Sequence, residues 1–259
     1  MTNAVRLSSD APAERLAAMN ELVTRGTAAS PAELEALFQC LGDDRKEVQR
    51  RAAETCAHLA VHDPTVAQGL LHTLRGEGWR RRWGAVFALS LIGPLPAAAA
   101  ASLIDALGVD DGDIRWAAAE RLKQLAARES RLVIPELLRL AADGSAEQRK
   151  MALYCLRDLD VGEAVEVAQS ALRADDVGVR LAALSAFARL ADERAAAAEK
   201  IVALLKDADD RVRRAAAATL GTLGSRAPVV ISALQQICSA EDPSLRRAAE
   251  RSLKILQGG

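Results

Sequence analysis

Apolar residues recur along this chain in eight similar segments of 13 residues, whose first residues lie 31 to 34 positions apart. With the first residue of each segment numbered 0, position +4 is alanine in all eight, position +8 is apolar in all eight, and position +11 is Leu or Ile in seven. Positions 0, +4, +8 and +11 share one side of an α-helix. The pattern therefore predicts eight equivalent amphipathic helices, in residues 14–26, 48–60, 81–93, 114–126, 148–160, 179–191, 212–224 and 245–257.

A second amphipathic stretch precedes most of these helices, and a turn rich in Asp, Gly and Ser joins the two. Ser30-Pro31 and Asp63-Pro64 each place a capping residue before a proline suited to the first helical turn, and Gly93-Pro94 ends a helix. Each repeat is thus a helix A, a short turn and a helix B, and residues 10–26 are expected to supply only a helix B that caps the array. We expect one domain over residues 1–259, with about 7.5 helix pairs and full repeats at about 31–61, 64–93, 96–127, 131–160, 162–191, 194–224 and 226–257.

The helix B segments resemble HEAT repeats of the short bacterial kind, similar to those of phycobilisome lyases, whose helix B reads V-R-x-x-A-A-x-A-L-G-x-L-G. The segment from Val212 to Gly224 is close to that pattern, and the resemblance covers residues 10–257. Glu14, Arg81 and Gln148 depart from it, because they replace the apolar residue at position 0. The resemblance implies an all-α fold, an α-α superhelix or HEAT-repeat solenoid, in which helix B lines the concave side.

Composition agrees with an all-α fold, because half of the residues are apolar whereas aromatic residues make up only 3%. The N-terminus has no signal-peptide pattern and no apolar run is long enough to cross a bilayer, so we expect a cytoplasmic protein without a membrane partner. The four cysteines are widely spaced and form no CxxC pair, so we expect buried thiols rather than a metal site or disulfides.

Arginine occupies position +1 in seven of the eight segments, and an aspartate often lies four or five residues earlier. One interpretation is a ladder of guanidinium groups that binds a ligand. Because a residue that recurs in every repeat serves the repeat, we expect instead that these arginines and aspartates bridge the turns of adjacent repeats. The arginines are Arg15, Arg82, Arg115, Arg149, Arg180, Arg213 and Arg246.

Positions +2, +6 and +9 face away from the predicted core, and their residues differ from repeat to repeat. These 24 positions hold four of the seven aromatic residues and carry eight basic but only two acidic residues, although the whole chain has a net charge of −1. Exposed aromatic and basic side chains are typical of a recognition surface. The candidate binding residues on it are Trp83, Phe87, Trp116, Tyr154, Arg50, Lys123, Lys150 and Arg157.

Two local features add alternatives. In the run from Trp79 to Trp83, three arginines lie between two tryptophans. The arginines could bind an anion together, or Trp79 could pack over the turn against the next repeat. His58 and His62 lie one helical turn apart, with His72 in the next helix, but no carboxylate with ligand spacing joins them, so we expect no metal site.

The sequence therefore predicts a non-enzymatic scaffold that binds an acidic protein or peptide. It predicts no catalytic residue and no cofactor. Nucleic-acid binding on the same surface is the alternative. By fold analogy alone, a DNA glycosylase of the HEAT-like alkylpurine type is conceivable, with Trp83, Trp116 and Glu120 gripping damaged DNA, and so is a phycobilin-lyase-like protein.

Overall fold

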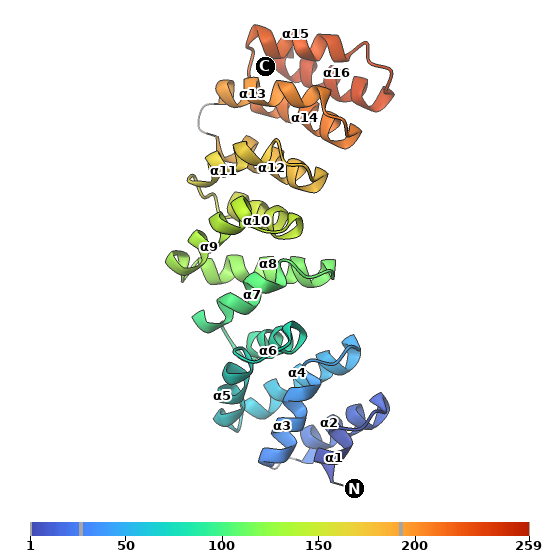
Figure 1. Ribbon diagram of the computed structural model, residues 1–259, viewed down its shortest axis with the longest axis vertical. Coiled ribbons are helices and arrows are strands. Elements are labelled where there is room, and N and C mark those ends of the chain that lie inside the picture. The colour runs from blue at the N-terminus through green and yellow to red at the C-terminus, as the bar shows by residue number, and fades with distance from the viewer. Residues whose placement is uncertain (1, 26–27, 192–193, 259) are drawn as a thin grey trace. The chain divides into compact units, whose positions relative to one another are not determined.

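The computed structural model describes residues 2–25, 28–191 and 194–258, which form α-helices and short 3₁₀ turns and contain no strand (Figure 1). The predicted all-α class is therefore confirmed. The end of the first predicted helix B, at Gly26, lies outside the described residues. The chain divides into two compact units, Met1–Leu132 and Val133–Gly259, here called the N-terminal and the C-terminal unit.

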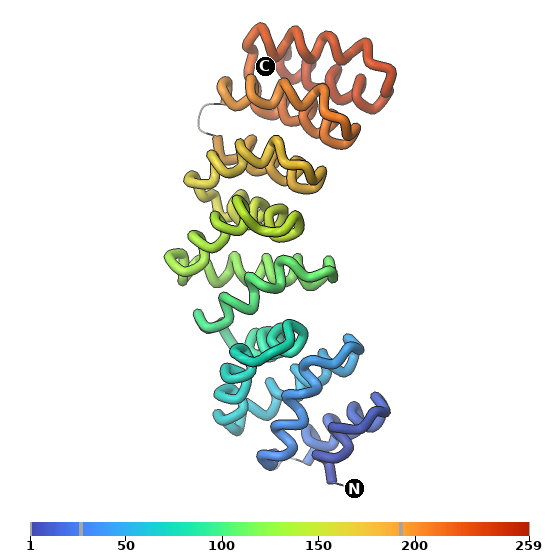
Figure 2. Tube along the Cα trace, viewed as in Figure 1, coloured from blue at the N-terminus to red at the C-terminus, as the bar shows by residue number. Residues whose placement is uncertain are grey.

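The N-terminal unit is a stack of four helix pairs in two layers (Figures 1 and 2). Within it, α2 packs on α4 and α4 packs on α6, whereas α1 packs on α3 and α3 on α5. The helices of this unit are α1 (Asn3–Leu7), α2 (Pro12–Arg25), α3 (Pro31–Cys40), α4 (Lys46–Ala60), α5 (Pro64–Thr73), α6 (Trp79–Ile92), η1 (Ala97–Ala99), α7 (Ala100–Ala106) and α8 (Gly112–Ala126).

The C-terminal unit repeats this arrangement, with α10 packed on α12, α12 on α14 and α14 on α16 (Figure 2). The first three residues of its first helix lie before the division between the units. The helices are α9 (Ser130–Asp143), α10 (Ala146–Asp158), α11 (Ala164–Ala171), α12 (Val177–Leu190), α13 (Arg194–Val202), η2 (Ala203–Lys206), α14 (Asp210–Leu223), α15 (Pro228–Ile237) and α16 (Pro243–Gly258).

The first repeat differs from the prediction, which gave it only a helix B. The five-residue helix α1 packs against both α2 and α3 and thus takes the place of a short helix A. Leu7 anchors it, with only 1% of its surface exposed. The sequence signal was weak because one and a half turns are too short to show a helical period.

Alanine at position +4 fixes how closely the layers pack. All eight of these alanines are fully buried, at 0% exposure. A methyl group is the largest side chain that fits there, so neighbouring helices approach closely and bury the larger residues at position +8. The alanines are Ala18, Ala52, Ala85, Ala118, Ala152, Ala183, Ala216 and Ala249.

The capping prediction is also confirmed. The side chain of Ser30 accepts a hydrogen bond from the Glu33 amide, and that of Asp63 accepts one from Thr65. The departures at position 0 have local causes. Gln148 closes a capping box with Ser145 at the start of α10, and Arg81 donates to Oε1 of Gln39 at 2.7 Å.

Candidate partner-binding surface

The outward face of the helix B layer, formed by positions +2, +6 and +9 and here called the helix-B surface, lies at the molecular surface. Of its 24 residues, all except Trp83 and Gly221 are exposed or half-buried. The helical phase deduced from the aligned alanines is therefore correct. What these residues do depends on their neighbours, which the structure supplies.

The recurring arginine belongs to the scaffold rather than to this surface. In six repeats, its guanidinium donates a hydrogen bond to the backbone carbonyl six residues earlier, at the end of helix A, and so closes the turn between helix A and helix B. The donor–acceptor pairs are Arg15–Ser9, Arg82–Gly76, Arg115–Val109, Arg180–Ala174, Arg213–Asp207 and Arg246–Ala240.

Three of these arginines also reach the next repeat. The ion pairs are Arg15–Asp43 at 2.8 Å, Arg82–Asp105 at 2.8 Å and Arg180–Asp207 at 2.8 Å. The expected bridge between adjacent repeats is therefore present, and the ladder interpretation is wrong, because the guanidinium groups are occupied by the turns.

The aspartates four residues before these arginines have a capping role that was not predicted. Asp111, Asp176, Asp209 and Asp242 accept hydrogen bonds from backbone amides at the start of their own helix B. Two of them also bridge repeats as predicted, because Asp242 pairs with Arg214 at 3.5 Å and Asp111 pairs with Lys46 at 2.8 Å.

Trp83 does not have the exposure that the sequence predicted. Only 8% of its surface is accessible. The guanidinium of Arg121, on α8, lies 5.7 Å from the centre of the Trp83 ring and covers it from the side of the next repeat. Trp83 is therefore part of the packing between α6 and α8, and it is not available to grip DNA in the way that the glycosylase analogy required.

The α6–α8 junction is more widely spaced than the other junctions between helices B within each unit. The backbones of α2 and α4, and of α4 and α6, approach closely, whereas those of α6 and α8 do not. Side chains fill the difference, because Trp83 and Phe87 on α6 and Arg121 on α8 are all large. Phe87 remains half-buried, with its ring centre 5.6 Å from the Arg121 guanidinium.

Trp116 is the most exposed aromatic side chain among the candidate residues. It lies on α8 in the N-terminal unit, and 55% of its surface is accessible. Tyr154, on α10 in the C-terminal unit, is half-buried, and the Arg157 guanidinium lies 5.1 Å from its ring centre. The N-terminal unit thus supplies three of the four predicted aromatic residues and the C-terminal unit supplies one.

The four predicted basic residues are each paired with a carboxylate close by in sequence. The pairs are Arg50–Glu54 at 3.1 Å, Lys123–Glu120 at 2.9 Å, Lys150–Glu147 at 2.7 Å and Arg157–Asp158 at 2.6 Å. All four pairs reach solvent, and ion pairs at the surface contribute little stability. They lower the net positive charge that these residues were expected to present.

The remaining positive charge gathers on one unit. On the helix-B surface of the N-terminal unit, two basic residues are balanced by Glu54 and Glu120. On that of the C-terminal unit, no acidic residue occupies the twelve positions, and six basic residues do: Lys150, Arg157, Arg214, Arg247, Arg251 and Lys254. Because Lys150, Arg157 and Arg214 pair with carboxylates beside the surface, the charge that remains is mainly that of the three basic residues on α16.

Arg121 is a site residue that sequence reasoning missed. It stands at position +7, where six of the eight repeats have a small side chain. Its Nε is buried without an acceptor, and its contacts to Ser90 Oγ and the Ala117 carbonyl are both long, at 3.4 Å. Burial lowers the pKa of the Arg121 guanidinium from its ordinary value. The signal that could have found it is a long cation at a position that holds Ala, Cys, Ser or Thr in six of the other repeats.

The run from Trp79 to Trp83 is not a clamp, because its three arginines have separate scaffold contacts. Arg80 lies over the Trp79 ring, with 4.7 Å to its centre. Arg81 donates to Gln39, whereas Arg82 contacts Gly76 and Asp105.

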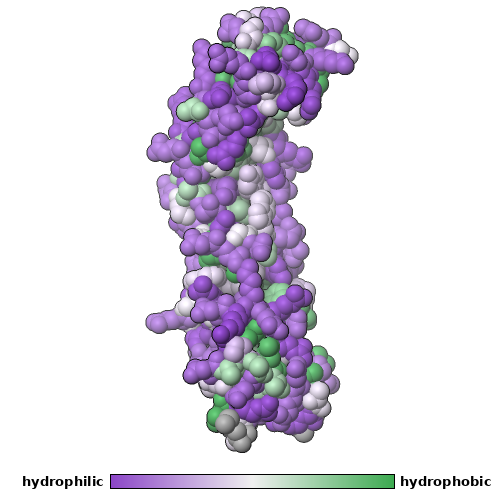
Figure 3. All heavy atoms as spheres, turned by 90° about the vertical axis from the view of Figure 1, so that its right-hand side faces the viewer, coloured by the Kyte–Doolittle hydropathy of each residue, from purple (hydrophilic) through white to green (hydrophobic). Residues whose placement is uncertain are grey.

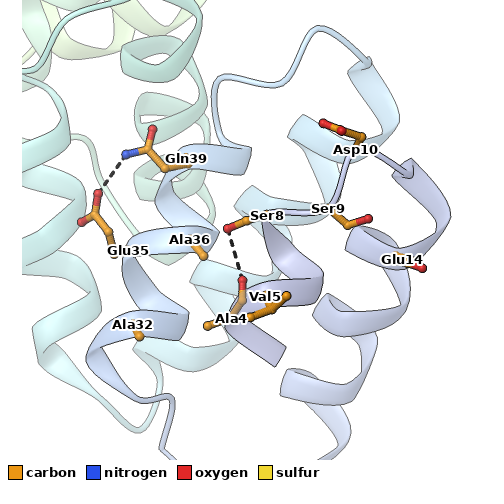
Figure 4. A pocket seen from close by; sticks show the side chains of 10 residues that line it. All are labelled: Ala4, Val5, Ser8, Ser9, Asp10, Glu14, Ala32, Glu35, Ala36 and Gln39. Atoms are coloured by element: carbon orange, nitrogen blue, oxygen red, sulfur yellow. Dashed lines mark hydrogen bonds between the residues drawn. The ribbon is translucent and has the colours of Figure 1, made fainter. Parts of the chain in front are cut away.

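Grooves of ligand size, about 370 to 730 Å³, occur in at least four places among the described residues, and two of them exceed 600 Å³. One, of about 730 Å³, lies beside α1 and α3 in the first repeat; Ala32 and Ala36 line it, and Asp10, Glu14 and Glu35 give it an acidic border (Figure 4). The other, of about 630 Å³, lies on the helix-B surface of the C-terminal unit between α12 and α14. Its lining includes Ser185, Ala188, Arg189, Ala218 and Thr222.

Metal-ligand types do not gather within the described ranges, where no three His, Cys, Asp or Glu side chains form a possible metal site. Cys40, Cys56 and Cys155 are buried and unbridged. Burial raises the pKa of the Cys40 thiol to about 11, which keeps it protonated and unreactive at neutral pH. Within the same ranges, no helix has the length and apolar character that a membrane crossing needs.

The comparisons with known proteins concern the fold. The family model described as HEAT repeats matches residues 34–123 and 171–254. No curated protein matches the sequence significantly.

Several solved structures share the fold at low sequence identity. The karyopherin Kap121p bound to the extreme C-terminus of the protein phosphatase Cdc14p matches 98% of this chain over 33% of its own, with 11% identity and a TM-score of 0.63. Importin beta matches 98% over 40%, with 16% identity and a TM-score of 0.60. YibA of Escherichia coli matches 93% over 96%, with 16% identity and a TM-score of 0.56. The chain thus spans less than half of the length of Kap121p and of importin beta.

Proposed function

The chain belongs to the HEAT-repeat family, and from that premise we propose that it is a non-enzymatic scaffold that binds a protein or peptide through its helix-B surface. The positions that repeat hold the stack together, as the buried alanines and the turn-closing arginines do. The residues that differ between repeats lie on the helix-B surface, and a specific partner is recognised by such non-repeating residues.

The observation that carries the proposal is the exposure of Trp116. Tryptophan buries a large area at a low cost in side-chain entropy, so it is enriched at the centres of protein interfaces. This chain has only three tryptophans, and one of them presents 55% of its surface to solvent on the helix-B surface. The face drawn in Figure 3 is mostly hydrophilic, with apolar residues in small separate patches.

The C-terminal unit supports an acidic partner. Its helix-B surface carries six basic side chains and no acidic one at the twelve outward positions. Among these, Arg247, Arg251 and Lys254 are exposed on α16. Basic surfaces raise the association rate of acidic partners. One of the neighbours in fold, Kap121p, is a protein seen with a bound peptide segment of another protein.

The test compares Trp116→Ala with a matched change elsewhere. Immobilised wild-type protein, Trp116→Ala and Val61→Ala are each incubated with a lysate of the source organism, and bound proteins are quantified by mass spectrometry. Val61 is 74% exposed but lies outside the helix-B surface, so it controls for the loss of exposed apolar area. We expect the partner to be lost with Trp116→Ala and kept with Val61→Ala. Equal capture by all three proteins would rule out the helix-B surface as the binding site.

Nucleic-acid binding is the second candidate, favoured by the same basic residues of the C-terminal unit. Each phosphate contact releases a counterion, so affinity for DNA or RNA falls steeply with salt, by about a thousandfold or more between 50 and 200 mM for six contacts. An interface anchored by an aromatic side chain responds weakly. A steep salt slope for a labelled oligonucleotide, reduced by about one unit in Arg251→Ala, would favour the second candidate.

A further inference from the structure

Arg121 is the half-buried cation of the N-terminal unit that lacks a strong acceptor. Four arginines bury Nε without an acceptor among the described residues. Arg15 and Arg180 compensate through aspartates, and Arg81 through the amide of Gln39. Arg121 contacts only a hydroxyl and a backbone carbonyl, both at 3.4 Å. Burial is the sole cause of its lowered pKa, so no carboxylate offsets its charge.

The surroundings of this guanidinium are built from large side chains. The ring centres of Trp83 and Phe87 lie 5.7 and 5.6 Å from its central carbon, and the backbones of α6 and α8 stay apart around it. An arginine held on two aromatic faces loses little further freedom when a ligand binds, which favours affinity. A small residue, as at this position in most other repeats, would let the two helices close.

The donors that remain define the ligand. Each terminal guanidinium nitrogen carries two hydrogens, and one from each is directed at Ser90 or Ala117. One N–H on each terminal nitrogen is therefore left, which is the number of donors that the two oxygens of a carboxylate accept from a guanidinium. Nε is buried and takes no part. We propose that Arg121, held between Trp83 and Phe87, is a subsite for a carboxylate of the protein partner, from an acidic side chain or a C-terminus.

This inference rests on the proposed function, because it names the chemical group by which Arg121 would bind the partner of the helix-B surface. It places recognition of acidic groups in the N-terminal unit, on a single uncompensated cation, although the surplus of basic residues lies in the C-terminal unit. The two contributions differ in kind. Arg247, Arg251 and Lys254 of the C-terminal unit are exposed and attract at long range, whereas the half-buried Arg121 would make one bidentate contact.

The experiment is an NMR titration of the intact chain with two short peptides, acetyl-Ala-Glu-Ala-amide and acetyl-Ala-Gln-Ala-amide, at matched ionic strength. The three tryptophan indole N–H signals are the reporters. We expect the Glu peptide to shift the Trp83 signal saturably, with a dissociation constant on the order of 10 mM, while the Trp79 signal stays in place. The Gln peptide, identical in shape, is expected to cause no shift.

Three variants locate the effect. Arg121→Met keeps the side-chain volume and is expected to weaken binding at least tenfold. Arg121→Lys keeps the charge without the bidentate geometry and is expected to weaken it several-fold, so it serves if the Met variant unfolds. Arg51→Met removes another arginine of the N-terminal unit, one already paired with Glu54 and Asn20, and is expected to change nothing.

Several outcomes would overturn the subsite. They are equal shifts with the two peptides, undiminished binding to Arg121→Met and Arg121→Lys, or Arg121-dependent binding of inorganic phosphate or an oligonucleotide in place of the Glu peptide. If Trp116 proves necessary for lysate capture while Arg121→Lys binds the Glu peptide as wild type does, the proposed function stands and this subsite falls. If the Glu peptide binds at Arg121 while Trp116→Ala captures normally, the subsite stands and the proposed surface contact at Trp116 falls.

Discussion

The Arg180 guanidinium lies 2.8 Å from the carboxylate of Asp207, and both side chains are nearly buried, at 12% and 8% exposure. Arg180 also donates to the Ala174 and Asp175 carbonyls. One side chain therefore closes its own turn and joins it to the turn of the next repeat. Arg180, one of the arginines considered for ligand binding, therefore has a structural role: it ties two turns together.

Removing this tie should destabilise the C-terminal unit. Arg180→Ala leaves the Asp207 carboxylate buried without its partner, and such a loss costs about 3 kcal/mol. The expected result is a lower free energy of unfolding in a urea titration. Arg251→Ala, which removes an exposed arginine, is the control and should change stability by less than about 0.5 kcal/mol. Similar values for the two variants would contradict the structural role of Arg180.

Two alanines of α14 test the packing register. Ala216, at position +4, is fully buried, whereas Ala218, at position +6, is exposed. Ala216→Leu adds three carbons where neighbouring helices meet, and overpacking of this kind costs about 1–3 kcal/mol. Ala218→Leu should be close to neutral. A thermal unfolding comparison of the two variants gives the sign directly, and an equal effect would show that the helical phase is wrong.

Gly84 tests the close contact between α6 and the end of α3. A Cβ at this position would lie 2.2 Å from the carbonyl oxygen of Leu41, which is backbone and unable to give way. Gly84→Ala should therefore destabilise the chain, although alanine favours helices by about 1 kcal/mol over glycine. Gly162, where a Cβ meets nothing within 4 Å, should show the opposite sign on substitution by alanine, through a less flexible unfolded chain. Stabilisation by both changes would contradict the contact.

Glu33 gives a pH dependence of known sign. Its hydrogen bonds from Arg25 and from Ser30 lower the pKa of the carboxyl from 4.5 to about 2. Because the folded-state pKa is the lower one, the stability that Glu33 contributes is complete above about pH 5 and is lost as the pH falls towards 2. The difference in melting temperature between wild type and Glu33→Gln should therefore be constant from pH 7 to 5 and shrink below that. A difference independent of pH would contradict the ionised pair.

How far the sequence led can be judged from particular residues. The eight aligned alanines predicted the repeat, the approximate bounds of each helix B and its outward face. A pattern that recurs about every 33 residues remains visible even where single positions depart from it. The burial of Trp83 did not follow, since it depends on Arg121 reaching across from the next repeat. The pairing of Arg50, Lys123, Lys150 and Arg157 also depends on rotamers and on neighbours outside the outward positions. Helix α1 was missed because it is too short to show a period.

The central claim, that a partner binds the helix-B surface, is tested most directly by site-specific photo-crosslinking. Benzoylphenylalanine is placed at position 120, one helical turn from Trp116 on α8, and separately at position 35, on the exposed face of α3 in the helix A layer. After irradiation with the captured partner, we predict a crosslinked product from position 120 and none from position 35. A crosslink from position 35 alone would place the partner on the helix A layer and contradict the account.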